Sequence, residues 1–94
     1  MKNLIISPAI LEKLQSKHGV SRREVEQCFE NLEGPLLIDS REDHRSDPPT
    51  LWFLARTHRN RVLKVVYIQK GSRVFLRTCY APNDDELDIY AKNS

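Results

Sequence analysis

Three β-strand patterns between Leu51 and Tyr80, separated by two short turn signals, constrain the fold of this chain most strongly. Residues 55–67 alternate as a β-strand does, and all three patterns contain β-branched or aromatic side chains, which favour strands. The connections are the tripeptide at residues 58–60 and the pair Lys70-Gly71. Because connections this short join antiparallel neighbours, we predict a meander of strands at residues 51–57, 61–69 and 72–80.

Helix signals precede this meander. Ser7-Pro8 provides a capping residue followed by proline at the first helical position, and Gly19 ends that helix. A second helix begins after Ser21, which forms an S-x-x-E capping box with Glu24. We predict that this second helix ends at Gly34-Pro35.

The segments on either side of the meander complete the predicted order of elements. The apolar run LLID at residues 36–39 either pairs as a fourth strand or stays outside the sheet, and the polar segment 40–49 reads as a loop. After the meander, Asn83 caps a short C-terminal helix with Glu86 three residues on. We therefore predict an α+β fold with two N-terminal helices packed on a three- to four-stranded antiparallel sheet, followed by a C-terminal helix.

Length and cysteine spacing limit the class of protein. The 94 residues suffice for a single domain, residues 1–94, with one modest core. Cys28 and Cys79 form no CxxC motif, and the three histidines lack a spacing that completes a zinc site, so we expect no metal and no cofactor. No apolar run has the length of a signal peptide or a membrane span. We expect a cytoplasmic protein with reduced thiols and no membrane partner.

Charge is segregated along the chain. The net charge is only +2, from 15 basic and 13 acidic residues. Residues 84–88 nevertheless contribute four acids, whereas residues 48–83 contain no Asp or Glu. The basic residues of that acid-free segment are Arg56, Arg59, Arg61, Lys64, Lys70, Arg73 and Arg77. Such a segment indicates an anionic partner.

Strand alternation divides the predicted sheet into two faces. If Lys70-Gly71 is a two-residue hairpin turn, Lys64 lies directly opposite Arg77. If residues 58–60 form the other loop, Ala55 lies opposite Leu63 and Phe53 opposite Val65. One face is apolar and forms the core: Leu51, Phe53, Ala55, Leu63, Val65, Tyr67, Val74 and Leu76. The opposite face is basic with aromatic residues between the charges: Trp52, Leu54, Arg56, Lys64, Val66, Arg73, Phe75 and Arg77.

The predicted pair of Lys64 and Arg77 requires an anion, because like charges directly opposite each other destabilise a sheet. Two interpretations are open. In the first, the phosphate backbone of RNA lies on this face and Trp52 or Phe75 stacks on a base. In the second, the acidic C-terminal helix folds back and its carboxylates neutralise the patch. The two interpretations predict opposite effects of removing the Lys64 charge on stability.

Several segments, in order along the chain, carry a resemblance to a known family. They are KHGVS at residues 17–21, Asp43-His44, ARTHRNRVLKVVY at residues 55–67, FLRT at residues 75–78, and the pair Glu86 and Tyr90. Together they resemble the BrnT family of bacterial type II toxins, ribonucleases related in fold to RelE. The resemblance covers about residues 17 to 90. The chain departs from the family pattern at Pro49-Thr50, where the family has Glu-Arg, and at TCYAP after Arg77, where it has I-S-A-R.

The resemblance implies an endoribonuclease toxin that cleaves RNA without a metal and is neutralised by a cognate antitoxin. Metal-free cleavage requires a base for the 2′-hydroxyl, cations for the phosphate and a proton donor for the leaving oxygen. The candidate catalytic residues are Arg56, His58, Arg61, Lys64 and Arg77. The candidate RNA-binding residues are Trp52, Arg73, Phe75 and His44. Tyr80 reads either as a proton donor or as a core tyrosine.

A second function fits the same residues. The chain is then a non-catalytic domain of this fold whose basic face binds RNA or an acidic protein. A third possibility is a structural relic whose basic patch is neutralised internally. Growth arrest with cleaved transcripts separates an RNA-cleaving toxin from the other two, and salt-dependent RNA binding separates the binding domain from the relic.

Overall fold

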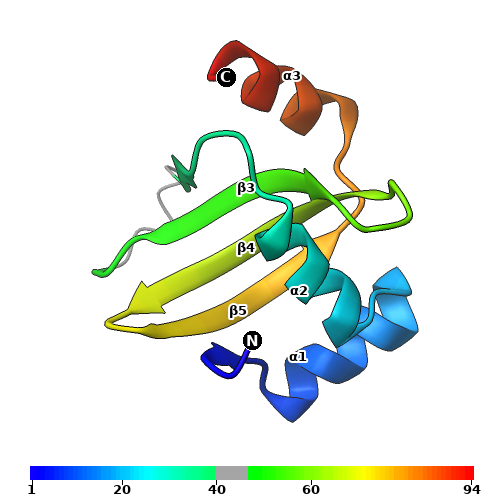
Figure 1. Cartoon of the computed structure of the whole chain (residues 1–94), viewed down its shortest axis with the longest axis vertical. Helices are drawn as coiled ribbons and strands as arrows, with labels where there is room; N and C mark the ends of the chain where they lie inside the picture. The colour runs from blue at the N-terminus through cyan, green and yellow to red at the C-terminus, as the bar shows by residue number, and fades with distance from the viewer. Residues whose placement is uncertain (40–46) are drawn as a thin grey trace.

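The predicted meander forms the centre of a five-stranded sheet in the computed structural model, which describes residues 1–39 and 47–94 (Figure 1). The central strands are β3 (Thr50–Arg56), β4 (Val62–Lys70) and β5 (Arg73–Tyr80). Two short strands, β1 (Leu4–Ile5) and β2 (Leu37–Ile38), lie at the edges, and the strand order is β1-β5-β4-β3-β2. The α+β class is therefore confirmed.

The two edge strands change the predicted architecture. β2 pairs antiparallel with β3, so the LLID run does join the sheet. β1 pairs parallel with β5, with Leu4 opposite Val74, so the sheet is mixed and one strand precedes the first helix. The prediction of three to four antiparallel strands after two helices was wrong in these respects. A two-residue strand carries too little alternation to be recognised in a sequence.

The first helix begins at its predicted cap. α1 (Pro8–Lys13) starts after Ser7, whose hydroxyl oxygen accepts a hydrogen bond from the Ile10 backbone N–H at 3.3 Å. The helix continues as the π-helical turn η1 (Leu14–His18) and stops at Gly19, whose φ of 61° lies in the left-handed region that glycine adopts without strain.

The other two helices begin with complete capping boxes. In α2 (Arg22–Glu30), the Ser21 hydroxyl accepts from the Glu24 backbone N–H and the Glu24 carboxylate accepts from the Ser21 backbone N–H. In α3 (Asp84–Lys92), Asn83 and Glu86 form the same reciprocal pair. None of the helices in residues 1–39 and 47–94 is long and apolar enough to span a membrane.

Two apolar cores lie on opposite faces of the sheet. Every residue of the predicted core face belongs to the larger core, which also takes in residues from α1, η1 and α2. The smaller core contains Trp52, Leu54 and Val66, with Leu37 of β2 and Tyr90 of α3 packed against them. In Figure 1, α3 lies apart from α1 and α2. We call the sheet face that carries the smaller core the outer face; α3 covers part of it, so it is not the open basic surface that alternation predicted.

The strand register agrees with the prediction on one side of β4 only. Between β3 and β4, Ala55 lies opposite Leu63 and Phe53 opposite Val65, as predicted. Between β4 and β5, the turn is Gly71-Ser72, and Lys70 pairs with Arg73. Gly71 has a φ of 60° at the first turn position, as in a type II′ hairpin. This turn shifts the predicted pairing by two residues.

A β-bulge then removes the predicted pair of like charges. Tyr67 lies opposite Leu76, but the next residue of β4, Val66, lies opposite Thr78, so Arg77 is the extra residue. Beyond the bulge, Lys64 lies opposite Tyr80 instead of Arg77. The prediction of a directly opposed Lys64 and Arg77 was therefore wrong.

Candidate functional site on the outer face

The predicted catalytic residues do not form one cluster, and Arg61 shows why. Its Nη1 donates to the Gly19 carbonyl oxygen at 2.8 Å and to the Glu24 carboxylate at 3.1 Å, and its Nη2 donates to the His18 carbonyl oxygen at 3.1 Å. The guanidinium thus connects the end of η1 with the start of β4, because it donates to the carbonyl oxygens of His18 and Gly19. Arg61 supports the fold between the helices and the sheet and does not face the outer surface with the other candidates.

Arg56 and His58 lie at the β3–β4 hairpin. Arg56 Nη1 donates to the side-chain and backbone oxygens of Asn60 at 3.2 and 3.3 Å. His58 Nε2 lies 3.1 Å from a carboxylate oxygen of Glu30 on α2. Both side chains are exposed and have local partners. The structure does not bring either of them to Lys64.

Two of the predicted RNA-binding residues are not available as predicted. Trp52 is buried, and His44 lies outside the described part of the chain. Trp52 is only 8% exposed because Tyr90 and Leu37 pack around it, with 5.8 Å between the Trp52 and Tyr90 ring centroids. Its ring therefore does not stand free on the outer face for stacking.

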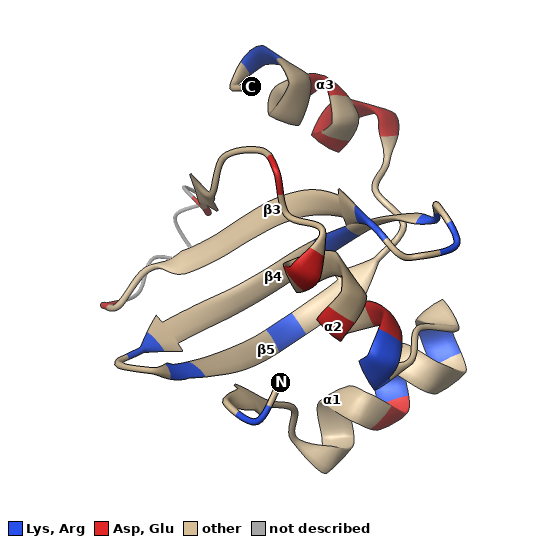
Figure 2. Cartoon of the chain, viewed as in Figure 1, with Lys and Arg blue, Asp and Glu red and all other residues tan. Residues whose placement is uncertain are grey.

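Three cations of β4 and β5 lie near Phe75 on the outer face. Lys70, Arg73 and Arg77 are exposed, and none of them forms an ion pair with any residue of the described ranges. Lys70 Nζ lies 5.5 Å from the Phe75 ring centroid. Lys70, Phe75 and Arg77 line a hollow of about 280 Å³. We call Lys70, Arg73, Phe75 and Arg77 the basic strip. Figure 2 shows that β3, β4 and β5 carry no acidic residue.

A polar cluster lies farther along β5 on the same face. Lys64 is 8% exposed, its Nζ contacts a carboxylate oxygen of Glu86, and it lies 4.6 Å from the Trp52 ring centroid. The Tyr80 hydroxyl donates to the same Glu86 oxygen at 2.9 Å. The other Glu86 oxygen accepts from the Asn83 backbone N–H at 3.0 Å. We call Lys64, Tyr80 and Glu86 the polar cluster.

The surroundings of the polar cluster fix its protonation. Burial alone raises the pKa of Glu86, but hydrogen bonds from Lys64, the Asn83 backbone and Tyr80 together hold that pKa below its usual value. Burial, followed by the hydrogen bond to Glu86, raises the pKa of Tyr80. At neutral pH the Glu86 carboxyl group is therefore ionised and the Tyr80 hydroxyl keeps its proton, which it shares with Glu86 in a hydrogen bond.

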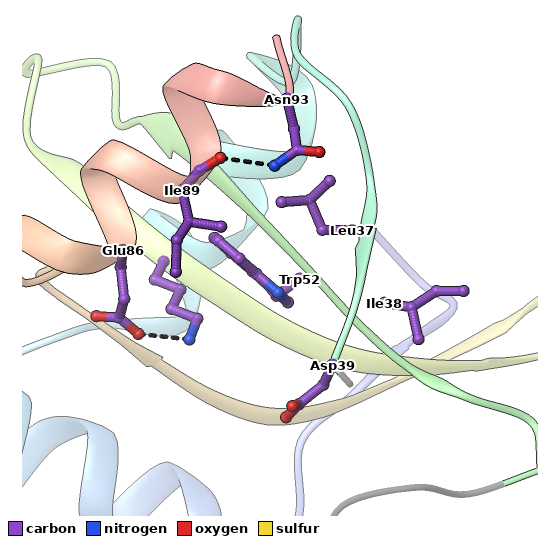
Figure 3. A pocket seen from close by; sticks show the side chains of 8 residues that line it. Leu37, Ile38, Asp39, Trp52, Glu86, Ile89 and Asn93 are labelled. Atoms are coloured by element: carbon purple, nitrogen blue, oxygen red, sulfur yellow. Dashed lines mark hydrogen bonds and ion pairs between the residues drawn. The ribbon is translucent and has the colours of Figure 1, made fainter. Parts of the chain in front are cut away.

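A cleft opens next to the polar cluster, between β2, the sheet and α3. Its volume is about 460 Å³, within the range of about 300–1,000 Å³ that small-molecule sites occupy. It is lined by Leu37, Ile38, Asp39, Trp52, Lys64, Glu86, Ile89 and Asn93. Figure 3 shows side chains from α3 and from the β2 segment on either side of Trp52.

The described residues provide neither a metal-binding group nor an ionised thiol at this site. Within residues 1–39 and 47–94, no group of His, Cys, Asp and Glu side chains is placed to hold a metal ion. Cys28 and Cys79 are free and buried. Burial raises the pKa of Cys28 to about 11 and raises the pKa of Cys79 as well, so neither thiol is a nucleophile at neutral pH.

The fold and the site define a small α+β protein with a mixed sheet, whose outer face carries a basic strip and a carboxylate–phenol–lysine cluster beside a cleft. No protein-family model matches the chain, and no curated protein matches it. From the sequence we predicted that Glu86 either takes part in the cap of the C-terminal helix or neutralises the basic face of the sheet. It does both, because one oxygen caps α3 and the other contacts Lys64.

Proposed function

We propose that this protein is a metal-free ribonuclease of the type II toxin class that binds single-stranded RNA along the outer face of β5 and cleaves it at the polar cluster. The observation that carries the proposal is the position of two features on one strand face. Arg73, Phe75 and Arg77 belong to the basic strip, and Tyr80 belongs to the polar cluster. A strand rises about 3.3 Å per residue, so these features span roughly 20 Å.

The basic strip supplies the groups that hold RNA. Three cations that have no ion-pair partner within the described residues attract phosphates, and the partly exposed Phe75 ring offers a surface on which a base stacks. Because no acid lies on the central strands, nothing on the sheet itself competes with the phosphates. The BrnT resemblance adds an antitoxin as the protein partner of this surface.

The polar cluster supplies the groups for cleavage. The Glu86 carboxylate accepts the proton of the 2′-hydroxyl, and the 2′-oxygen attacks the adjacent phosphorus. Lys64 moves from Glu86 to the phosphate oxygens and stabilises their charge. The bond from phosphorus to the 5′-oxygen breaks, and Tyr80 donates its proton to that oxygen. The products are a 2′,3′-cyclic phosphate and a 5′-hydroxyl.

The second candidate function is a non-catalytic domain that binds RNA or an acidic protein. One observation favours it: Glu86 already neutralises Lys64, so the contact also has a purely structural role. The two candidates differ in whether RNA is cut.

Incubation of the purified protein with single-stranded RNA in the presence of EDTA tests the proposal. We expect fragments that end in 2′,3′-cyclic phosphates, detected by mass spectrometry. RNA binding without cleavage by a preparation that circular dichroism shows to be folded would overturn the ribonuclease proposal and leave the RNA-binding alternative. The absence of both, together with capture of an acidic protein, would leave the protein-binding alternative.

We also expect Arg77→Ala to weaken RNA binding and to reduce the salt dependence of the affinity by about one counterion, because one phosphate contact is lost. A salt titration of binding to a labelled single-stranded RNA measures both quantities. Arg59→Ala is the matched control, since Arg59 is exposed but lies in the β3–β4 hairpin connection, outside the basic strip. Equal losses in both variants would show that binding depends on total charge and not on the strip.

A further inference from the structure

We infer that this chain forms a closed two-fold dimer in which α3 of each copy docks on the basic strip of the other copy. The inference does not depend on the proposed function, since it concerns two complementary protein surfaces and not a reaction. It assigns a partner to each of these surfaces, which do not pair with each other within one chain.

The first surface is the exposed side of α3. Asp84, Asp85 and Asp88 are exposed and form no ion pair with any residue of the ranges 1–39 and 47–94. Leu87 of the same helix is 41% exposed. Asp84 and Leu87 are three residues apart, so they are neighbours on one side of the helix. This side of α3 therefore presents an apolar side chain next to a carboxylate.

The second surface is the hollow on the basic strip. Ile68 and Phe75 are among its apolar side chains, and Lys70 and Arg77 are its cations. The remaining side chain is that of Ser7, whose hydroxyl oxygen already accepts the hydrogen bond that caps α1. No acid of the described residues lines the hollow, and its volume of about 280 Å³ accommodates a leucine side chain. Its apolar floor and cationic rim complement the exposed side of α3.

Within one chain, α3 is held away from the basic strip. Contacts of Glu86 with Lys64 and of Tyr90 with Trp52 keep the helix over the smaller core. No cation of the strip forms an ion pair with an acid of α3 in the described chain. The acids of α3 and the cations of the strip are thus complementary but separate. A second copy of the chain supplies the partner that each surface lacks.

The positions of the two surfaces fit a closed dimer, because both lie on the outer face. Figure 1 shows α3 next to β3, whereas most of the basic strip belongs to β5, on the other side of β4. If two copies meet outer face to outer face about a two-fold axis, each α3 lies over the other copy's strip. The nine residues of α3 and the strand from Arg73 to Arg77 each span about 13 Å. Such an interface closes on itself, so association ends at the dimer.

The dimer is expected to be weak and sensitive to salt, because exposed charges supply much of the attraction. We expect a Kd on the order of 100 µM in about 0.05 M NaCl, and dimerisation at least about tenfold weaker in about 0.5 M NaCl. Sedimentation velocity over a series of protein concentrations measures both values.

An exchange of charges tests whether these two surfaces meet. Asp84→Lys and Arg77→Glu each place like charges across both contacts of the dimer, so each variant alone is expected to dimerise at least about tenfold more weakly. In an equimolar mixture, the altered α3 of one variant meets the altered strip of the other, and the second contact joins two unaltered surfaces. Heterodimers are therefore expected to form with about wild-type affinity.

Two matched controls restrict the effect to one side of α3. Asp85→Lys reverses a charge in the same helical turn as Asp84, but Asp85 is two residues from Leu87 and does not share its side, so the Kd stays within about threefold of wild type. Leu87→Gln is expected to weaken dimerisation about fivefold. Ile89→Gln makes the same kind of change at a residue that lines the cleft beside β2, and leaves dimerisation unchanged. Circular dichroism establishes that each variant is folded.

Sedimentation also identifies the results that overturn the inference. A monomer at every concentration, no recovery in the mixture, or equal losses in Asp84→Lys and Asp85→Lys would each do so. Growth into larger assemblies would contradict the closed two-fold arrangement.

Addition of single-stranded RNA separates this inference from the proposed function. RNA that dissociates the dimer supports both, because the second copy and the RNA then compete for the basic strip. A dimer that binds no RNA, or that RNA leaves intact, supports the inference and contradicts RNA binding along the strip. RNA binding by a protein that stays monomeric at every concentration does the reverse.

Discussion

Glu86→Gln is expected to slow RNA cleavage at least about 100-fold, because the neutral amide cannot accept the proton of the 2′-hydroxyl. RNA binding is expected to change little, since the cations of the basic strip do not contact Glu86. The rate is measured under single-turnover conditions with a labelled RNA, and the affinity is measured separately. Circular dichroism at the assay temperature establishes that the variant is folded.

Two further variants make this result specific to the polar cluster. Tyr80→Phe keeps the ring but removes the hydroxyl that donates to Glu86 at 2.9 Å, so cleavage also slows. Asp88→Asn is the matched control, because Asp88 is an exposed acid on the same helix. Full activity in Glu86→Gln would exclude Glu86 as the base. An equal loss in Asp88→Asn would point to a general effect of the acidic helix.

Local signals predicted where the three helices begin, but α2 ends at Glu30, before the predicted end at Gly34-Pro35. The capping boxes of Ser21 with Glu24 and of Asn83 with Glu86 involve residues three apart, so the sequence contains the whole interaction. The two faces of β3 and β4 were also predictable, because alternation along a strand depends on the backbone alone. β1 was missed because its pairing with β5 joins residues about 70 positions apart through two residues only.

The candidate site was less predictable than the fold. Alternation assumes an unbroken ladder, and the bulge at Arg77 together with the Gly71-Ser72 turn moved Lys64 from Arg77 to Tyr80. The contact of Lys64 with Glu86 then depends on how α3 returns to the sheet after residues 81–83, and no local pattern specifies that path. Arg61 was read as a phosphate ligand because the sequence does not reveal that the carbonyls of His18 and Gly19 lie within its reach.

Of the two interpretations of the basic face, neutralisation by the acidic C-terminal helix applies to Lys64 and to no other cation of the outer face within the described residues. The acidic helix does fold back, and Glu86 pairs with Lys64. The exposed cations of the basic strip receive no such partner within the described residues. Neutralisation by α3 therefore applies to Lys64, and an external anion is our proposed partner for the basic strip alone.

Lys64→Met is accordingly expected to lower the free energy of unfolding by about 2 kcal/mol, because it leaves the Glu86 carboxylate, whose side chain is 13% exposed, without its cation. Urea denaturation of both proteins without RNA measures the difference. Lys70→Met is the control on the same strand. Lys70 is exposed and forms no ion pair in the part of the chain that the structure describes, so its loss changes stability by less than about 0.5 kcal/mol. The double variant Lys64→Met with Glu86→Gln is expected to recover part of the loss, since no buried charge then remains unpaired.

The pH dependence of stability gives an independent check on the same pair. The folded pKa of Glu86 lies below its ordinary value of 4.5, so the folded state favours the ionised form. Its contribution to stability is therefore fully present above about pH 5 and is lost as the pH falls through the folded pKa. Glu26, whose pKa the hydrogen bond from the N-terminal amine lowers, contributes in the same direction. Urea melts between pH 3 and pH 7 should thus show wild-type stability falling with acid more steeply than that of Glu86→Gln; parallel curves would mean that the contact with Lys64 does not stabilise the folded protein.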